Sequence, residues 1–515
     1  MLDGILQGLG TAMMPINIFM VIVGCFVGTF IGMLPGLGPV TAIALMIPIT
    51  YGLDPASGII LMAGVYYGSM FGGSTSSILI NTPGCSASMI TAIDGYPMAC
   101  KGQAGKGQAG KALAIAAYAS FTGGTLSAIF LMVAAPLLAK VSLSFQSADY
   151  FALMVLGLSA VAAFAGKGQV LKALIMALFG IMLSTVGIDR SVGVDRFTFG
   201  LPDLRDGFSF LLLAMATFAL AEILMTVLRP GKDTSKEEVS KIQQLGSLKL
   251  SKTEVKEIAP PIVRSSVLGF LIGVLPGAGA TIASFMAYGA ERNFASKRRQ
   301  EEFGKGSLTG VAAPEAANNA ASSGAFVPLL TLGIPGSGTT ALMLGALIAY
   351  GIQPGPRLFM EHPDVFWSVI ISMYLGNVVL LILNLPLIPY LAKILQVPRP
   401  VLIPMVLLFS LIGVYLVSFN TMDIYVMALV ALIAIGLRLL DFPMAPMLLG
   451  FILGGMLEDN LRRALVINDG SLSFLWERPI TLGFTLVTLV MLLLPIWQWW
   501  QARRAPVETL HSELT

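Results

Sequence analysis

The feature that most constrains the fold is an apolar stretch, residues 24–84, that proline-glycine pairs interrupt at Pro35 and Pro83. A run of small residues with four hydroxyl groups, 72–77, lies between the two breaks. Inside a membrane, irregular backbone is tolerated only where protein buries it or where it lines a water-filled cavity. Such breaks also free N–H and C=O groups that can bind a ligand. We therefore interpret this stretch as one half of a substrate site.

The same pattern recurs roughly 240 residues later in the chain. The first break has matching residues in both halves: Gly28, Gly32, Leu34, Pro35, Gly36 and Gly38 correspond to Gly269, Gly273, Leu275, Pro276, Gly277 and Gly279. The second break recurs at Pro335. Interrupted apolar segments at corresponding places in two halves are the best sequence indication of a transporter site at a repeat interface.

This recurrence predicts an internal duplication with a specific division of the chain. The predicted parts are a first membrane half, a hydrophilic linker, a second membrane half and a C-terminal tail, over residues 1–228, 229–263, 264–500 and 501–515. By analogy with other transporters, we expect the two halves to be inverted relative to each other. A basic insert, residues 292–305, follows the break at Pro276. It would face the same side of the membrane as the linker only if the chain turns back at Pro276, as a re-entrant segment.

The composition sets the class of protein. Hydrophobic residues make up 56% of the 515 residues and charged residues only 11%, whereas soluble proteins carry about 25% charge. A span needs roughly 20 apolar residues, and we expect about 11–13 membrane segments. The expected fold is therefore an all-α polytopic membrane protein in a lipid bilayer, built from two repeats with Pro-Gly-broken or re-entrant helices. The net charge of +3 is too small to indicate nucleic-acid binding.

The breaks suggest how an anion would be bound. A helix that restarts after Pro-Gly presents unpaired N–H groups and the positive end of its dipole, which attracts carboxylates without a buried Lys or Arg. Two such ends facing each other, with hydroxyls beside them, would suit a di- or tricarboxylate. The candidate substrate-binding residues are Pro35, Gly36, Gly38, Ser74, Thr75, Ser76, Asn81, Thr82, Pro83, Gly84, Pro276, Gly277, Gly279, Pro335, Gly336, Ser337, Gly338 and Thr339.

A second candidate group consists of Glu315, Asn318 and Asn319, which follow Pro314 in an alanine-rich segment. Their spacing places them on one helical face. A carboxylate inside a membrane is costly and indicates function by default. The alternative is that Glu315 lies at the membrane interface near a helix start after Pro314, where the helix dipole stabilises it. We predict that these residues serve a coupling cation, Na⁺ or H⁺, with a Na⁺ site beside them as one option. No other cofactor or metal is expected.

Other classes of function find little support. The polar, glycine-rich segment from Asp94 to Lys111 is expected to be a loop between membrane segments. Residues 105–111 within it nearly match a phosphate-binding loop, but Ala112 stands where Ser or Thr must hold magnesium. The sequence contains neither HExxH nor GxSxG, and it has only two histidines. We therefore predict that the protein is not an enzyme and that it does not use ATP.

Several motifs resemble a known family: Gly32–Gly38, Tyr67–Ser74, Asn81–Gly84, Ala313–Asn319 and Gly333–Gly338. They are similar to segments of the large membrane subunit of tripartite tricarboxylate transporters, the TctA family. The resemblance implies a multi-pass secondary transporter of the bacterial inner membrane that imports carboxylates such as citrate, driven by a sodium or proton gradient. It also implies two partners, a small four-helix membrane subunit and a periplasmic solute-binding protein. A passive carboxylate channel and a stand-alone carrier for another small organic anion are the alternatives.

Overall fold

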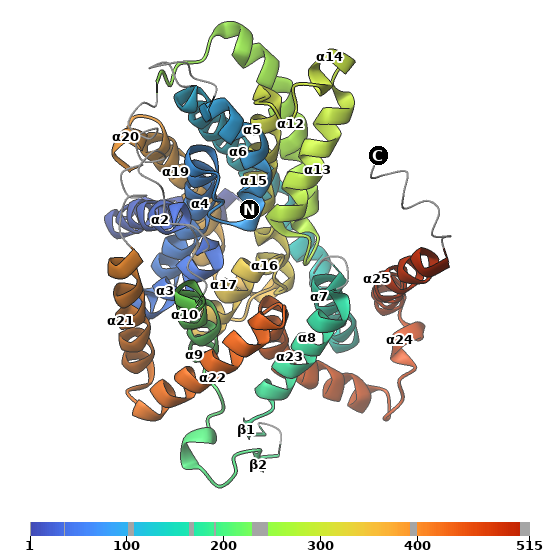
Figure 1. Ribbon diagram of the computed structural model, residues 1–515. Helices are drawn as coiled ribbons and strands as arrows, with labels where there is room; N and C mark the ends of the chain where they lie inside the picture. Colours follow the sequence, from blue (N-terminus) through green and yellow to red (C-terminus); the bar gives the residue numbers. More distant parts are fainter. Residues whose placement is uncertain are drawn as a thin grey trace.

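The chain is almost entirely helical in the computed structural model (Figure 1), which describes residues 2–34, 37–100, 108–163, 169–189, 192–228, 246–391 and 399–504. Within these ranges the only strands are β1 (Gly187–Ile188) and β2 (Asp195–Arg196), which pair antiparallel. The expectation of an all-α protein is confirmed.

The helices of the first half, in chain order, are α1 (Leu2–Ala12), α2 (Pro15–Met33), α3 (Gly38–Thr50), α4 (Pro55–Ile80), η1 (Ser86–Ser88), α5 (Met89–Cys100), α6 (Ala109–Ser142), α7 (Ser147–Ala163), α8 (Val170–Ser184), η2 (Pro202–Leu204), α9 (Phe210–Ala214), the π-helical segment η3 (Met215–Leu220) and α10 (Ala221–Leu228).

The helices of the second half are α12 (Lys252–Val274), α13 (Gly279–Phe294), α14 (Lys297–Gln300), α15 (Leu308–Gly324), α16 (Phe326–Leu332), α17 (Gly338–Ala349), α18 (Pro356–Glu361), α19 (Pro363–Asn384), α20 (Ile388–Leu391), α21 (Arg399–Ser418), α22 (Thr421–Leu439), α23 (Ala445–Ile467), α24 (Phe474–Glu477) and α25 (Pro479–Arg504).

Two element boundaries differ from those expected from the sequence. Helix α12 begins at Lys252, inside the segment expected to be a linker, because Ser251 and Glu254 form a capping box. Helix α5 continues to Cys100, although the polar loop was expected to begin at Asp94. Asp94 is buried on this helix and accepts hydrogen bonds from the backbone N–H groups of Gly306 and Ser307, both at 2.8 Å.

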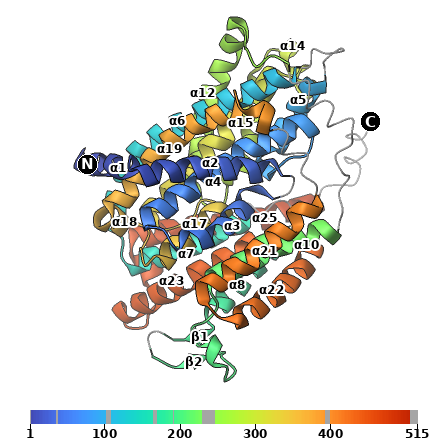
Figure 2. The ribbon, with the colours of Figure 1, turned by 90° about the vertical axis from the view of Figure 1, so that its left-hand side faces the viewer.

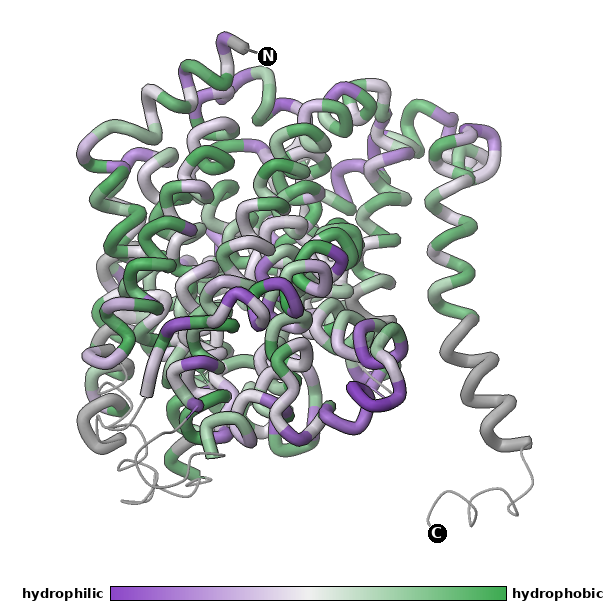
Figure 3. The backbone as a smooth tube through the Cα atoms, turned by 90° about the horizontal axis from the view of Figure 1, so that it is seen from above, coloured by the Kyte–Doolittle hydropathy of each residue, from purple (hydrophilic) through white to green (hydrophobic). Residues whose placement is uncertain are grey.

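Five helices among the described residues are long and apolar enough to cross a membrane: α2, α6, α12, α19 and α22. Shorter apolar helices accompany them, among them α3, α8 and α17. Hydrophobic residues line the helices throughout the body of the molecule (Figure 3), and large apolar side chains such as Leu137 and Leu178 are exposed on its periphery. The protein is therefore a multi-pass membrane protein. The count of 11–13 segments stays a prediction.

Helices α4 and α15 form the centre of the molecule. Every residue from Ala56 to Ile80 is buried, and so is every residue from Thr309 to Gly324. Helix α4 packs against α2, and α15 packs against α12 and α6. The hydroxyl run and the Ala313–Asn319 motif of the sequence are thus in the core, away from lipid.

Glycines bring each central helix close to its partner. A Cβ atom built on Gly28 of α2 would lie 2.7 Å from the Cα of Val65 on α4. The same distance separates a Cβ built on Gly269 of α12 from the Cα of Ala317 on α15. Real Cβ atoms do not approach so closely, so only glycine permits this packing, as in other small-residue helix contacts.

The last helices complete two sides of the molecule. Helices α10, α21 and α22 lie together beside α3 (Figure 2), and α21 and η3 both contact α3. Helices α8 and α23 pack together, and α25 packs on α7 (Figure 1). The side that contains α10 and α22 forms one wall of the cavity described below.

Candidate functional site

The residues that flank the first break have similar backbone geometry in both halves. Leu34 caps the C-terminus of α2 (φ −76°, ψ 122°), and Leu275 caps that of α12 (φ −77°, ψ 120°). The following helices, α3 and α13, begin at Gly38 (φ +58°) and Gly279 (φ +63°). Both glycines have left-handed backbone conformations that other residues rarely adopt, which explains why glycine occupies these positions.

The second breaks also correspond in geometry. Asn81 (φ 51°) caps the C-terminus of α4 and Gly333 (φ 69°) caps that of α16, both in left-handed backbone conformations. An extended residue then precedes the next helix, Cys85 before η1 and Ser337 before α17, and each forms a capping box with the residue three positions later. A helix therefore restarts after each of the four breaks, two in each half.

In each half, the second break packs on the end of the helix that precedes the first break. A Cβ built on Gly84 would lie 2.8 Å from the Cα of Gly73 and would collide with the carbonyl oxygen of Gly32. A Cβ built on Gly336 would lie 3.1 Å from the carbonyl oxygen of Gly273, and the Gly336 carbonyl accepts a hydrogen bond from the N–H of Gly277 at 3.0 Å. Close backbone approach therefore fixes the second break of each half against that helix.

The starts of the four restarted helices surround one cavity of about 770 Å³. A volume in this range is typical of small-molecule sites. Hydrogen bonds cross the cavity wall between the halves: the Ser86 and Thr281 hydroxyls lie 2.7 Å apart, and the Tyr66 and Ser337 hydroxyls 3.4 Å apart. The lining residues at the helix starts are Gly38, Pro39, Ser86, Ala87, Gly279, Ala280, Thr281, Gly338 and Thr339.

The structure divides the candidate substrate-binding residues into two sets. Those that line the cavity are Gly38, Pro83, Gly84, Gly277, Gly279, Ser337, Gly338 and Thr339. Those described but not lining it are Ser74, Thr75, Ser76, Asn81, Thr82, Pro276, Pro335 and Gly336. Pro35 and Gly36 lie outside the described residues. Ser76 donates a hydrogen bond to the Gly73 carbonyl of its own helix at 3.0 Å, so its hydroxyl is used within α4.

Two charged residues that we did not predict also line this cavity. Glu222 of α10 and Arg438 of α22 form an ion pair there. The Arg438 guanidinium also donates through Nη2 to the carbonyl oxygen of Thr217 at 2.8 Å. A sequence signal existed, because Glu222 is an acid inside an apolar segment. Its partner, more than two hundred residues away, gave no pattern.

Glu315 lies in a separate polar site in the core. Its carboxylate accepts hydrogen bonds from Ser74 Oγ at 2.6 Å and Ser120 Oγ at 3.0 Å, and a further one from Thr91 Oγ1. The three donors come from α4, α6 and α5, so the first half supplies the whole hydroxyl shell of a second-half residue. Glu315 is fully buried, and none of the described Lys or Arg side chains forms an ion pair with it.

Asn318 and Asn319 lie beside Glu315 on α15 and are also buried. The Asn319 amide nitrogen donates to the Asn318 side-chain oxygen at 2.5 Å and to the Glu315 carbonyl at 3.1 Å. Within the described part of the chain, the Asn318 side-chain nitrogen is buried without a hydrogen-bond partner. The three residues are brought together as the sequence spacing implied, but they do not line the 770 Å³ cavity.

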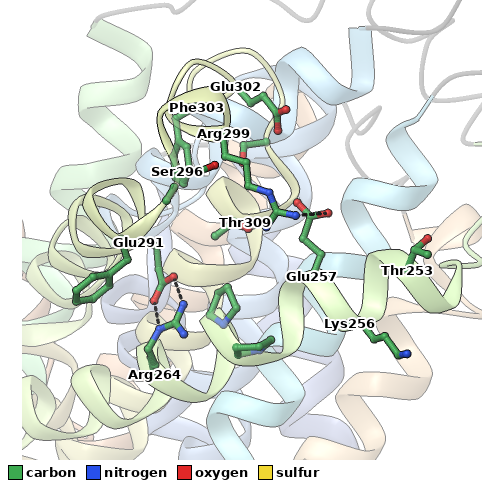
Figure 4. Close-up of a pocket in the computed structure, with 15 residues that line it drawn as sticks. Thr253, Lys256, Glu257, Arg264, Glu291, Ser296, Arg299, Glu302, Phe303 and Thr309 are labelled. Atoms are coloured by element: carbon green, nitrogen blue, oxygen red, sulfur yellow. Dashed lines mark hydrogen bonds and ion pairs between the residues drawn. The ribbon is translucent and has the colours of Figure 1, made fainter.

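Another cavity, of about 590 Å³, lies beside α12, α13 and α14 (Figure 4). Two of its arginines are paired with acids. Arg264 donates to both carboxylate oxygens of Glu291, at 2.9 and 2.6 Å, and Arg299 lies 3.7 Å from Glu257. Both arginines are therefore engaged by carboxylates, and we take the 770 Å³ cavity with its four helix starts as the candidate carboxylate site.

Comparison with known proteins agrees with the resemblance in the motifs. The tripartite tricarboxylate transporter TctA family matches residues 18–449. An uncharacterized 52.8 kDa protein in the TAR-I ttuC′ 3′ region of Agrobacterium vitis is 44% identical over 491 residues, covering 95% of each chain. An uncharacterized protein in the TAR-II ttuC′ 3′ region of the same organism is 44% identical over 230 residues, which cover 44% of this chain and 94% of that protein. No solved structure matches significantly. The chain therefore belongs to the tripartite tricarboxylate transporter TctA family, a family of transporters rather than enzymes.

Proposed function

We propose that this chain is the large transport subunit of a secondary active carrier that imports di- or tricarboxylates across the bacterial inner membrane. The observation that carries the proposal is the cavity of about 770 Å³ bordered by four helix starts. Each helix start attracts an anion by about 0.3–2 kcal/mol. Four such starts acting together would give about 1–8 kcal/mol, and the upper half of this range corresponds to millimolar to micromolar affinity. A carrier that must also release its substrate works well in this range.

The repeated geometry supports a carrier rather than a pore. Leu34 and Leu275, and likewise Gly38 and Gly279, have matching dihedral angles at matching places. We infer that the halves arose by duplication and are inverted relative to each other, with the substrate held between them. In such transporters, one half moves against the other around a fixed central site.

The Glu315 site is proposed to take the coupling cation. Its carboxylate faces hydroxyl groups rather than a basic side chain, and hydroxyl and carboxylate oxygens suit either a sodium ion or a proton carried on the carboxylate. A carboxylate would repel a carboxylate substrate, so Glu315 serves the cation and not the anion. Ser74 connects the two sites, because α4 also carries the chain into the Pro83 break at the cavity.

The partners follow from the family. The name of the family specifies a tripartite system, and we propose a small four-helix membrane subunit and a periplasmic solute-binding protein as the other two components. The binding protein would deliver the carboxylate to the face of the molecule from which the cavity is reached.

The test is uptake of radiolabelled citrate and succinate into proteoliposomes that contain the full-length chain and its partner subunits, under separate sodium and proton gradients. We expect accumulation above equilibrium in one of the two gradients. Gly338→Val should reduce uptake strongly, because it adds bulk to a cavity-lining helix start. Gly289→Val is the matched control, since Gly289 has open space around it and does not line the cavity. Equilibration without accumulation would favour a passive channel and contradict the proposal.

A further inference from the structure

Among the described residues that line the 770 Å³ cavity, Glu222 and Arg438 are the only ones with charged side chains. Arg438 lies in the last turn of α22 and Glu222 in the first turn of α10, and their side chains are 19% and 23% exposed. Ionisable residues on membrane helices are costly and are generally kept for function. The alternative is that the ion pair is a structural clasp, which only holds the two helices together. The geometry of the pair distinguishes this structural role from a role in ligand binding.

Arg438 is held by only part of its guanidinium group. Nη1 donates to one carboxylate oxygen of Glu222, Nη2 donates to the Thr217 carbonyl at 2.8 Å, and Nε is buried without a hydrogen-bond partner in the described structure. In contrast, Arg264 donates to both oxygens of Glu291 in the two-pronged arrangement that makes Arg–carboxylate pairs strong. A buried donor without a partner is unfavourable, so Glu222 holds Arg438 less firmly than Glu291 holds Arg264, and the guanidinium can exchange Glu222 for another carboxylate.

The backbone of the neighbouring segment is distorted to hold this arrangement. Residues Met215–Leu220 form a π-helix, a rare element that frequently occurs at functional sites. Its carbonyl oxygens accept hydrogen bonds from outside the helix: Thr217 from Arg438, and Phe218 from the Thr41 hydroxyl at 3.0 Å. The Phe218 ring lies under the guanidinium, 5.8 Å from its centre. Thr41 and Phe218 both line the cavity, so the π-helical distortion positions the guanidinium of Arg438 at the cavity wall.

We propose that Arg438 binds one carboxylate of the substrate and that Glu222 is an internal competitor, which occupies the guanidinium while the cavity is empty. This inference rests on the proposed function of the cavity. The planar guanidinium matches a carboxylate in geometry, and the helix starts on the other walls take a second carboxylate. The site therefore selects anions with at least two carboxylates over monocarboxylates of the same length.

The test is equilibrium binding of radiolabelled succinate and butyrate, a matched pair of four-carbon acids, to the purified full-length protein. Wild type should bind succinate more tightly than butyrate. Arg438→Gln should raise the Kd for succinate about tenfold or more, which is the effect of losing a charge-assisted hydrogen bond, and should bring it near the Kd for butyrate. Arg438→Lys should give an intermediate Kd. Glu222→Gln should lower the Kd for succinate several-fold, because the competing charge is gone.

Arg264→Gln and Glu291→Gln are the matched controls, since that pair lies outside this cavity, and they should leave both Kd values unchanged. If Glu222→Gln leaves succinate binding unchanged or weakens it, the pair is a clasp and the proposal is overturned. This outcome decides the question even if Arg438→Gln fails to fold. Labelled citrate is measured in the same assay, and wild type that binds neither succinate nor citrate would contradict the proposed function of the cavity itself, and this inference with it.

Discussion

Ser74 on α4 donates a hydrogen bond to Glu315 on α15 across 2.6 Å, although 241 residues separate them in the sequence. The sequence grouped Ser74 with the substrate site because it lies in a hydroxyl run between two breaks. In the structure its hydroxyl faces the buried carboxylate and does not line the cavity. The contact joins the two central helices, and it therefore links the proposed cation site to the element that ends at the Pro83 break.

The first prediction concerns this contact. Ser74→Ala should weaken the dependence of uptake on the coupling cation, because a hydrogen bond to a charged group contributes about 1.5–3 kcal/mol. Glu315→Gln should remove most of the ion-driven accumulation while affecting substrate recognition less. The measurement is the cation concentration that gives half-maximal uptake of labelled succinate.

Ser77→Ala is the control for Ser74→Ala, because the Ser77 hydroxyl is equally buried on α4 but donates within its own helix, to the Gly73 carbonyl at 2.8 Å. It should leave the half-maximal concentration unchanged. Wild-type accumulation by Glu315→Gln would show that the cation is bound elsewhere.

A second prediction concerns the break that enters the cavity. Pro83→Ala and Pro335→Ala should raise the Kd for substrate before they change the ion dependence, because each proline fixes the backbone before a restarted helix. The effect should be larger for Pro83, which lines the cavity, than for Pro335, which does not. Binding of labelled succinate to the purified variants measures this. A change in ion dependence with an unaltered Kd would contradict it.

Packing of the paired helices gives a third prediction. Gly28→Ala and Gly269→Ala should destabilise the protein by about 1–3 kcal/mol each, the usual effect of overpacking, because each added Cβ meets the backbone of the neighbouring helix. The measurement is the thermal unfolding midpoint in detergent. Gly483→Ala serves as the control, since it has open space around it, and its midpoint should equal that of wild type. A wild-type midpoint for Gly28→Ala would contradict the close packing of α2 on α4.

The fourth prediction concerns the partners. Proteoliposomes containing this chain alone should take up succinate far more slowly than those that also contain the small membrane subunit and are supplied with the binding protein. The reason is that a cavity of millimolar to micromolar affinity depends on a protein that concentrates the substrate at its entrance. Full-rate uptake by the chain alone would contradict a tripartite mechanism.

Local features of the fold and site could be predicted from the sequence, and long-range ones could not. The breaks at Pro83 and Pro335 and the cluster of Glu315 with two asparagines are visible because Pro-Gly pairs and an acid among alanines are local signals. The pairing of Arg438 with Glu222 depends on how α22 packs beside α10, which no local pattern encodes. The same holds for Ser74, because its hydroxyl direction is set by the packing of α4 on α15.

Helices α12 and α5 are also longer than the sequence predicted. The start of α12 at Lys252 depends on a capping box that lies in a lysine-rich stretch. The many charged residues of this stretch indicated a linker, although the local capping signal was present. Helix α5 holds Asp94 because the backbone of a segment more than two hundred residues away satisfies its carboxylate.

A structure of the full-length protein with succinate bound tests the proposed carboxylate site most directly. We expect ligand density in the 770 Å³ cavity, with one carboxylate at the starts of α3, α13 and α17 and the other at Arg438. Density in the cavity beside α12 and α14, in contact with Lys256 or Arg299, would contradict the assignment of the carboxylate site.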